Sequence, residues 1–346
     1  MDLINPVVRK YLRDGADDFE SFWDREARNI PWLRTWDHVF EGDYPSFKWF
    51  VGAETNLSFA CVDHHVRNGR GGHTALIYAS EHGDRKLMTY AQLQRSIEQA
   101  AAALRGMGLV KGDRLTIYMP NCLETVILML ATVRIGAIHS IVFAGFGAPA
   151  LADRVRASGS KLIFTADVAY RKGSEVLLKQ IVDETMALGC DEVQHVISLQ
   201  RKADPMPITP SRDLTWEEFL TKGSGQSGAF ERMEANEPAY ILATSGTTAS
   251  PKLAVHTHGG YPVGVYNQGR WCYGLNESDI WWATSDLGWA VGHSYIVYGP
   301  LLFGATSLLY EGALDYPGPD VFWRLIEEFS LTGVFTSPTA VRLLMR

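Results

Sequence analysis

The chain has 346 residues, of which 46% are hydrophobic and 21% are charged, and its 32 basic and 39 acidic side chains give a formal net charge of -7. This size and apolar content predict two α/β units with a large core. The negative net charge excludes a protein that coats nucleic acid and favours small-molecule partners. It still allows a local basic pocket. The four cysteines lie far apart without CxxC spacing, which predicts neither a metal site nor a disulfide framework and fits the cytoplasm.

Residues 1–60 are expected to form an N-terminal arm laid over the body of the protein. The segment is rich in Trp, Phe, Asp and Pro without a sustained period, as in DFESFWDREARNIPWLRTWD, and its aromatic side chains are expected to pack. Its first residues mix both charges and contain no apolar stretch followed by small residues. No secretory signal is therefore predicted.

Residues 61–235 alternate between helix and strand signals. A helix is predicted to begin after the N-cap residue Thr89 and to stop at Gly108. The apolar run 126–146 contains Arg134 and other interruptions, so it predicts a buried helix and strand rather than a membrane span. Further elements are the strands RLTIYM, SIVFA, KLIFTA and HVISL and the helices 123–133, 150–157 and 175–187. This order predicts a parallel sheet with helices on both faces.

A polar, Pro-rich connector separates this unit from a second one. It spans residues 200–237, which places the domain boundary near Ala235. Residues 236–346 then resume the rhythm, with helices near Gly260 and from Pro319 and with the strands AYILAT, DIWWATS, ATSLLYEG and GVFTSP. Trp281 and Trp282 on one strand are assigned to the core. The fold class is therefore α/β, with two successive subdomains of mostly parallel sheets flanked by helices.

The segment TSGTTASPK, residues 244–252, has the composition of a phosphate-binding loop. Its hydroxyl and backbone groups can donate to anionic oxygens, and a lysine adds a positive charge. The GxxxxGK[ST] spacing of the standard P-loop is absent, and composition alone favours a solvated turn over a phosphate site. The candidate phosphate-contacting residues are Thr244, Ser245, Gly246, Thr247, Thr248 and Lys252, and the resemblance described next implies that their ligand is ATP.

This loop resembles the signature [YF]TSG[ST]TGxPKG of the acyl-adenylate-forming (AMP-binding) superfamily. Ala243, Ala249 and Leu253 depart from that signature, which indicates either a subfamily with an altered loop or weaker ATP binding. From the arm to the end, further stretches resemble acetyl-CoA and propionyl-CoA synthetases, among them KGDRLTIYMPNCLETVILMLATVRIGAIHSIVF, HTHGGY and SDLGWAVGHSYIVYGPLLFGAT. The chain is thereby identified as similar to the N-terminal part of such a ligase.

The resemblance implies an ATP-dependent short-chain acyl-CoA synthetase. An acetate- or propionate-like acid and ATP would form acyl-AMP and pyrophosphate, and the acyl group would pass to coenzyme A. ATP, Mg²⁺ and coenzyme A are the implied cofactors, with Lys252 and Thr248 as catalytic groups that neutralise phosphate charge. Two other readings stay open: an adenylating domain that delivers to a carrier protein, and a non-catalytic nucleotide- or CoA-binding module.

The resemblance also places two binding regions on this sequence. The stretch WAVGHSY contributes the acyl pocket through Trp289, Ala290 and Val291, and its His293 is either a pocket or a packing residue. The residues that match or neighbour the family's coenzyme A positions are Arg171, Lys172, Ser174, Val291 and Asp315. The family's AMP-contacting motif, ribose-binding aspartate and mobile C-terminal domain have no counterpart here. We therefore expect no turnover by this chain alone without a missing C-terminal region or a partner chain that supplies it.

Overall fold

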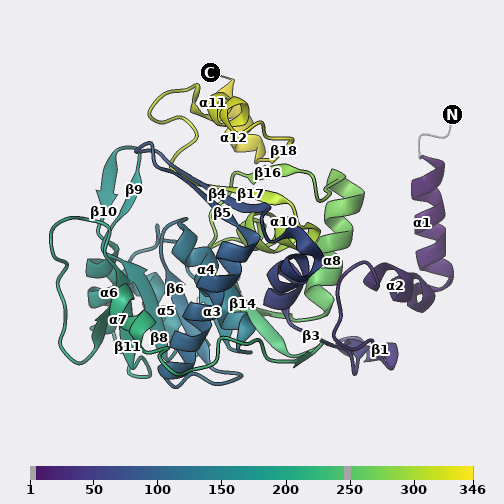
Figure 1. The fold of residues 1–346 in the computed structure, drawn as a ribbon, viewed down its shortest axis with the longest axis horizontal. Coiled ribbons are helices and arrows are strands. Elements are labelled where there is room, and N and C mark those ends of the chain that lie inside the picture. Colours follow the sequence, from purple (N-terminus) through teal and green to yellow (C-terminus); the bar gives the residue numbers. More distant parts are fainter. Residues whose placement is uncertain (1–4, 245–250, 346) are drawn as a thin grey trace.

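The computed structural model describes residues 5–244 and 251–345, and their strands build two large sheets (Figure 1). The larger has seven strands in the order β12-β11-β8-β6-β7-β14-β15, and all but the β14–β15 pair run parallel. Its strands are β6 Arg114–Tyr118, β7 Ile138–Ile141, β8 Leu162–Ala166, β11 His195–Leu199, β12 Asp213–Thr215, β14 Pro238–Thr244 and β15 Lys252–Thr257.

The second sheet has five strands in the order β18-β16-β17-β4-β5. Only the β4–β5 pair is antiparallel. Its strands are β4 Thr74–Ser80, β5 Arg85–Thr89, β16 Ile280–Ala283, β17 Thr306–Glu311 and β18 Gly333–Phe335. The mostly parallel α/β class is confirmed, because helices connect the parallel strands of both sheets.

Helices α3 and α4 pack on each other and form part of the largest core cluster, together with apolar residues of both sheets. Every residue of α4 except Glu124 is buried, which confirms the predicted buried helix within the apolar run. No helix in the described part of the chain is long and apolar enough to cross a membrane. The helices are α3 Tyr90–Gly106, α4 Leu123–Arg134, α5 Ala148–Ser158, α6 Leu178–Met186, α7 Trp216–Thr221, α8 Gly260–Gln268, α9 Ala290–Gly292, α10 Gly299–Phe303, α11 Val321–Glu328 and α12 Pro338–Leu344, with π-helical turns η1 Phe59–Asp63, η2 Val66–Arg70, η3 Gly269–Tyr273 and η4 His293–Tyr298.

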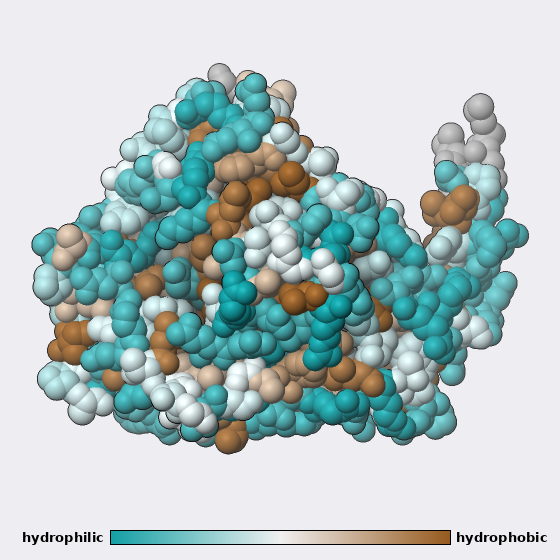
Figure 2. Space-filling model, viewed as in Figure 1, coloured by the Kyte–Doolittle hydropathy of each residue, from teal (hydrophilic) through white to brown (hydrophobic). Residues whose placement is uncertain are grey.

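The N-terminal arm contains two helices and a hairpin that the sequence pattern did not predict. Its tryptophans pack around Phe50 and Ala235, as expected for an arm held by aromatic contacts. Helix α1 lies at the edge of the molecule in Figure 1, with Tyr11 against Trp271 of η3 at a centroid distance of 5.7 Å, and Figure 2 shows hydrophobic colour on this part of the arm. Two residues of α1, Val7 and Leu12, are each 63% exposed. The arm elements are α1 Pro6–Asp17, α2 Phe19–Ala27, β1 His38–Asp43, β2 Ser46–Val51 and β3 Glu54–Thr55, the last of which pairs with β13 Met233–Glu234.

Local signals set the helix ends, whereas tertiary pairing set several strands. The Thr89 hydroxyl accepts from the Gln92 amide at 3.2 Å and the Gln92 side chain accepts from the Thr89 amide at 2.8 Å, which confirms the predicted N-cap. Strands β4, β5 and β15 were not predicted. The helix expected from Glu175 begins instead at Leu178, because residues 174–176 form β10, which pairs with β9 Ala169–Arg171.

The two sheets exchange strands across residue 235, where the sequence placed the domain boundary. Strands β14 and β15 follow this point yet join the sheet of β6 and β7, while β4 and β5 precede it yet join the sheet of β16 and β17. The connector itself is tied to the body, because Ala235 is buried in the arm's aromatic cluster. Composition could not show this, since strand exchange depends on pairing between distant segments.

Candidate functional site

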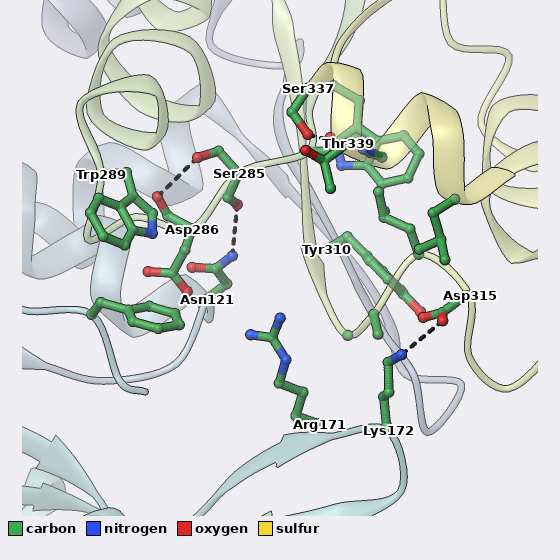
Figure 3. A pocket seen from close by; sticks show the side chains of 18 residues that line it. Asn121, Arg171, Lys172, Ser285, Asp286, Trp289, Tyr310, Asp315, Ser337 and Thr339 are labelled. Atoms are coloured by element: carbon green, nitrogen blue, oxygen red, sulfur yellow. Dashed lines mark hydrogen bonds and ion pairs between the residues drawn. The ribbon is translucent and has the colours of Figure 1, made fainter. Parts of the chain in front are cut away.

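A cavity of about 540 Å³ opens where strand ends from both sheets meet (Figure 3). Its lining includes residues that follow β6, β7, β16, β17 and β18 closely, namely Asn121, Phe143, Thr284, Gly312 and Ser337. The carboxyl ends of parallel strands lie at the same edge of a sheet, and ligands of open α/β sheets bind in the crevice outside that edge. The topology of the sheets therefore creates the candidate site.

A short basic hairpin forms one wall of this cavity. Strands β9 and β10 join through Lys172 and Gly173, and both Arg171 and Lys172 line the cavity. The Lys172 ammonium lies 2.7 Å from the carboxylate of Asp315, and this hydrogen bond lowers the pKa of that carboxyl group. Arg171 points into the cavity in Figure 3, and its guanidinium makes no hydrogen bond or ion pair with any residue that the structure describes.

Three of the four predicted coenzyme A positions outside the acyl segment therefore meet at the cavity. Ser174 is the exception, since it pairs with Arg171 across the hairpin and is exposed but does not line the space. Arg171 and Lys172 place two cationic groups on one exposed turn. Such a turn can bind a phosphate through charge-assisted hydrogen bonds.

The opposite wall carries one residue of the predicted acyl pocket. Trp289 is 48% exposed, lines the cavity and lies against the rings of Phe143 and Phe146 at centroid distances of 5.7 and 6.2 Å. Ala290 and Val291 continue into α9 and do not line this cavity. Trp289 thus lines the same cavity as the predicted coenzyme A residues, whereas Ala290 and Val291 do not line it.

His293 is a packing residue that also supports Trp289. Its ring is fully buried, stacks on Tyr240 at 4.7 Å, and its Nδ1 lies 3.1 Å from the carbonyl oxygen of Trp289. A carbonyl only accepts, so Nδ1 carries the proton. Burial lowers the pKa of His293 to about 4, and the ring is therefore neutral at pH 7 and outside the cavity lining.

Two polar cavity residues, Asn121 and Asp286, were missed in the sequence. The Asn121 side chain donates to the Ser285 carbonyl at 3.2 Å and accepts from the Leu287 amide at 3.1 Å, so it joins the end of β6 to the loop after β16. Asp286 accepts from the Gly288 amide at 2.8 Å and faces the charge of Arg171. Both residues could have been predicted from the sequence, because each follows the carboxyl end of a predicted parallel strand, where ligands of such sheets bind.

Stability should depend on pH through Asp286. Burial raises its pKa to about 6, above the value of about 3.9 for an unfolded chain, so between these values the folded state binds a proton that the unfolded state has lost. Wild-type protein is therefore expected to gain stability relative to Asp286→Asn as the pH falls from about 7 to about 5. Urea unfolding of both proteins at each pH measures this difference, and parallel changes would contradict it.

Two residues of the predicted phosphate loop are the facing ends of the antiparallel strands β14 and β15. Thr244 and Lys252 are register partners, with the Thr244 hydroxyl 3.3 Å from the Lys252 carbonyl, and both are exposed. Because β14 runs parallel to β7, Thr244 lies at the same sheet edge as Phe143 of the cavity wall. The remaining predicted loop residues, Ser245, Gly246, Thr247 and Thr248, lie outside the described residues.

Comparison with known proteins gives matches over nearly the whole chain. A family model described as AMP-binding enzyme matches residues 62–346, and one described as acetyl-coenzyme A synthetase N-terminus matches residues 9–61. The acetyl-coenzyme A synthetase of Deinococcus radiodurans is 43% identical over 98% of this chain and 52% of its own length. That of Pyrobaculum aerophilum is 42% identical over 97% of this chain and 52% of its own.

A solved structure gives the same result for the fold. The acetoacetyl-CoA synthetase from Streptomyces lividans superposes with a TM-score of 0.86 at 27% identity, covering 95% of this chain and 50% of that one. The chain therefore spans about half the length of the curated relatives and the solved structure that it matches.

Proposed function

This chain belongs to the AMP-binding enzyme family, and from that premise we propose that it forms the ATP- and CoA-binding half of an ATP-dependent short-chain acyl-CoA synthetase. The substrates would be an acetate- or propionate-like acid, ATP and coenzyme A, and the reaction would take place in the cytoplasm. The curated relatives named acetyl-coenzyme A synthetase support a short acid.

One observation carries this proposal: a single cavity joins a basic turn to an aromatic wall. Arg171 and Lys172 offer cations for the phosphates of coenzyme A, while Trp289 offers an apolar surface for a short acyl group. A carrier-protein partner would have no 3′-phosphate to meet these cations. The basic turn thus favours coenzyme A over carrier delivery.

The proposed chemistry needs no covalent enzyme intermediate. A carboxylate oxygen of the acid would attack the α-phosphorus of ATP, and pyrophosphate would leave to give acyl-AMP. The sulfur of coenzyme A would then attack the acyl carbonyl, with AMP as the leaving group. Catalysis would come from positioning and from neutralising phosphate charge.

We assign the phosphate contacts to the loop of residues 244–252, with ATP bound as its Mg²⁺ complex. Lys252 and Thr248 would contact the phosphate oxygens, and Mg²⁺ would neutralise further charge on the pyrophosphate. No group of three or more His, Cys, Asp or Glu side chains among the described residues could hold a metal ion by itself. Ala290 and Val291 remain proposed neighbours of the acyl group.

ATP is expected to raise the unfolding temperature of this chain, and the shift should be lost in Lys252→Ala. A ligand at 100 times its dissociation constant stabilises the folded state by about 2.7 kcal/mol. Lys48→Ala is the matched control, because Lys48 is an exposed lysine on the arm strand β2. Differential scanning fluorimetry with Mg²⁺–ATP makes the measurement. An absent shift in wild type would contradict ATP binding, whereas an equal shift in Lys252→Ala would contradict only the role of Lys252.

A further inference from the structure

The basic hairpin of β9 and β10 depends on other parts of the protein for its position. Among the described residues, its two strands pair only with each other, and residues 171–175 are exposed. An isolated two-stranded hairpin is at best marginally stable in water. Something outside the hairpin must therefore hold its turn against the cavity.

The carboxylate of Glu81 makes such a contact at the turn itself, while Tyr170 of β9 packs against the ring of His82 at 4.3 Å. Its Oε1 accepts from the Gly173 amide at 2.8 Å and its Oε2 accepts from the Lys172 amide at 3.0 Å. Glu81 is only 8% exposed, and it lies ninety-one residues before Lys172 in the chain. Both turn residues have positive φ, 51° at Lys172 and 72° at Gly173, and successive amides in such a turn can face one anionic group.

Glu81 is itself fixed to the five-stranded sheet. Its amide donates to the Glu311 carbonyl at the end of β17, at 2.9 Å. The Glu311 carboxylate forms a two-point ion pair with Arg201, at 2.7 and 2.8 Å. A Cβ atom at Gly312 would meet the Glu81 Cβ at 2.9 Å, so the two chain segments pack closely. The Glu81 carboxylate thus contacts the turn from a backbone position that is fixed by the end of β17.

We propose that Glu81 is a positioning residue that holds the turn so that Arg171 and Lys172 face the cavity. This inference rests on the proposed function, in which these two cations meet a phosphate of coenzyme A. Asp315 completes the arrangement from the loop after β17 by pairing with Lys172 at 2.7 Å. The five-stranded sheet thereby orients both the backbone and the lysine side chain of the turn.

The direction in which phosphate affinity changes when Glu81 is replaced distinguishes a positioning role from a purely electrostatic one. A carboxylate close to two cations weakens the local attraction for an anion, so its removal should strengthen phosphate binding if charge alone acts. If Glu81 holds the turn, its removal frees the hairpin and phosphate binding weakens instead. Glu175→Gln is the matched control, because Glu175 lies on the same hairpin and pairs with Lys202 at 2.8 Å without touching the turn amides.

Calorimetric titration of the 346-residue chain with coenzyme A and with dephospho-coenzyme A tests the proposal. We expect Glu81→Gln to raise the Kd for coenzyme A about tenfold and to leave that for dephospho-coenzyme A nearly unchanged, because loss of one hydrogen bond to a charged group costs about 1.4 kcal/mol or more, which is tenfold in affinity. Glu81→Asp keeps the charge but is shorter, and should weaken binding similarly. Glu175→Gln should leave the Kd unchanged or lower it. Unchanged or tighter binding by Glu81→Gln would overturn the proposal.

Amide hydrogen exchange of the peptide covering residues 169–176 provides a ligand-free readout. In the Glu81 variants we expect faster exchange there, with unchanged exchange in α3 and α4 as proof of folding. If the wild-type chain binds coenzyme A and dephospho-coenzyme A with the same Kd, the proposed contact of Arg171 and Lys172 with the 3′-phosphate is wrong. The exchange rates still test the role of Glu81 in that case. If both Glu81 variants exchange at the wild-type rate in this peptide, the positioning role of Glu81 is wrong.

Discussion

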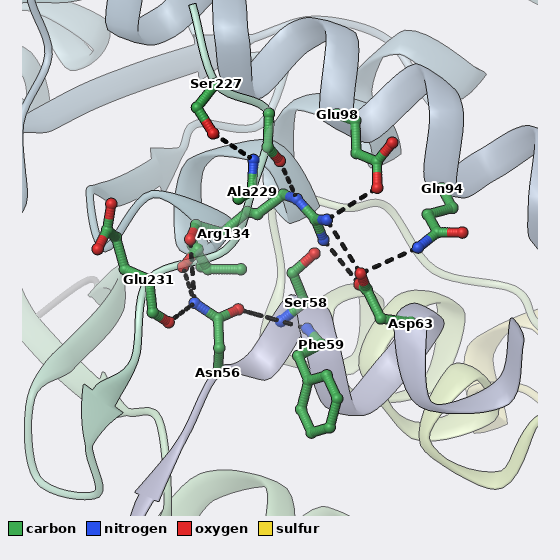
Figure 4. Close-up of polar contacts among 12 residues, drawn as sticks. Asn56, Ser58, Phe59, Asp63, Gln94, Glu98, Arg134, Ser227, Ala229 and Glu231 are labelled. Atoms are coloured by element: carbon green, nitrogen blue, oxygen red, sulfur yellow. Dashed lines mark hydrogen bonds and ion pairs between the residues drawn. The ribbon is translucent and has the colours of Figure 1, made fainter. Parts of the chain in front are cut away.

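Asp63→Ala is expected to lower the free energy of unfolding by about 3–5 kcal/mol, because it leaves a buried guanidinium without its main counter-ion. Figure 4 shows the arrangement around Arg134, whose two terminal nitrogens lie 2.7 and 2.9 Å from the Asp63 carboxylate. Both side chains are only 2% exposed. The guanidinium would therefore lose its main counter-ion at a position with little access to bulk water.

The same guanidinium joins four segments that are distant in sequence. Arg134 ends α4, Asp63 ends η1, the Gly228 carbonyl accepts from the Arg134 Nε at 2.6 Å, and Glu98 of α3 lies 3.1 Å away. In the same region Asn56 donates to carbonyls of α4 and of the connector. Loss of Asp63 should therefore loosen the contacts among these segments.

Urea unfolding followed by circular dichroism measures this effect. Asp153→Ala is the control, because Asp153 pairs with Arg156 at 2.6 Å on the surface of α5, with side chains 50% and 43% exposed. Exposed pairs contribute at most about 1 kcal/mol. Equal losses in the two variants would contradict the argument from burial. Arg134→Met in the Asp63→Ala background should recover part of the loss, since it removes the unpaired charge.

The second large effect concerns the rate of adenylate formation. Joined to the second half of the Deinococcus radiodurans relative, the chain is expected to catalyse acid-dependent exchange of pyrophosphate into ATP, and Lys252→Ala in that fusion should slow exchange by about 10²–10³-fold. The reason is that a cation opposite the developing phosphate charge stabilises the transition state more than the ground state.

Isotope exchange with labelled pyrophosphate and acetate or propionate makes this measurement. The Lys48→Ala fusion is the control for loss of an exposed lysine, and it should match the unmodified fusion. A folded fusion without exchange would contradict the proposed reaction. Full exchange in Lys252→Ala would instead show that other groups neutralise the phosphates.

Local chemistry in the sequence was sufficient for several elements. The hydroxyl of Thr89 and the side chain of Gln92 cap α3 as predicted, because capping involves residues within one turn. The core assignment of Trp281 and Trp282 is confirmed, with exposures of 5% and 1%. In contrast, β4 and β5 were missed, because β4 pairs with β17, more than 200 residues later, and β5 in turn pairs with β4.

The sequence by itself determined the α/β class, the family resemblance and the chemical types available for binding phosphate. Periodicity, caps and the hydroxyl-rich loop act over a few residues, so they can be recognised without tertiary contacts. Only the tertiary structure decided which of these residues meet. It brought Arg171, Lys172 and Trp289 to one cavity, left Ala290 and Val291 outside its lining, and placed Glu81 under the basic turn. The physical reason is that strand order and register, which arise from hydrogen bonds between distant segments, set the positions of the strand ends.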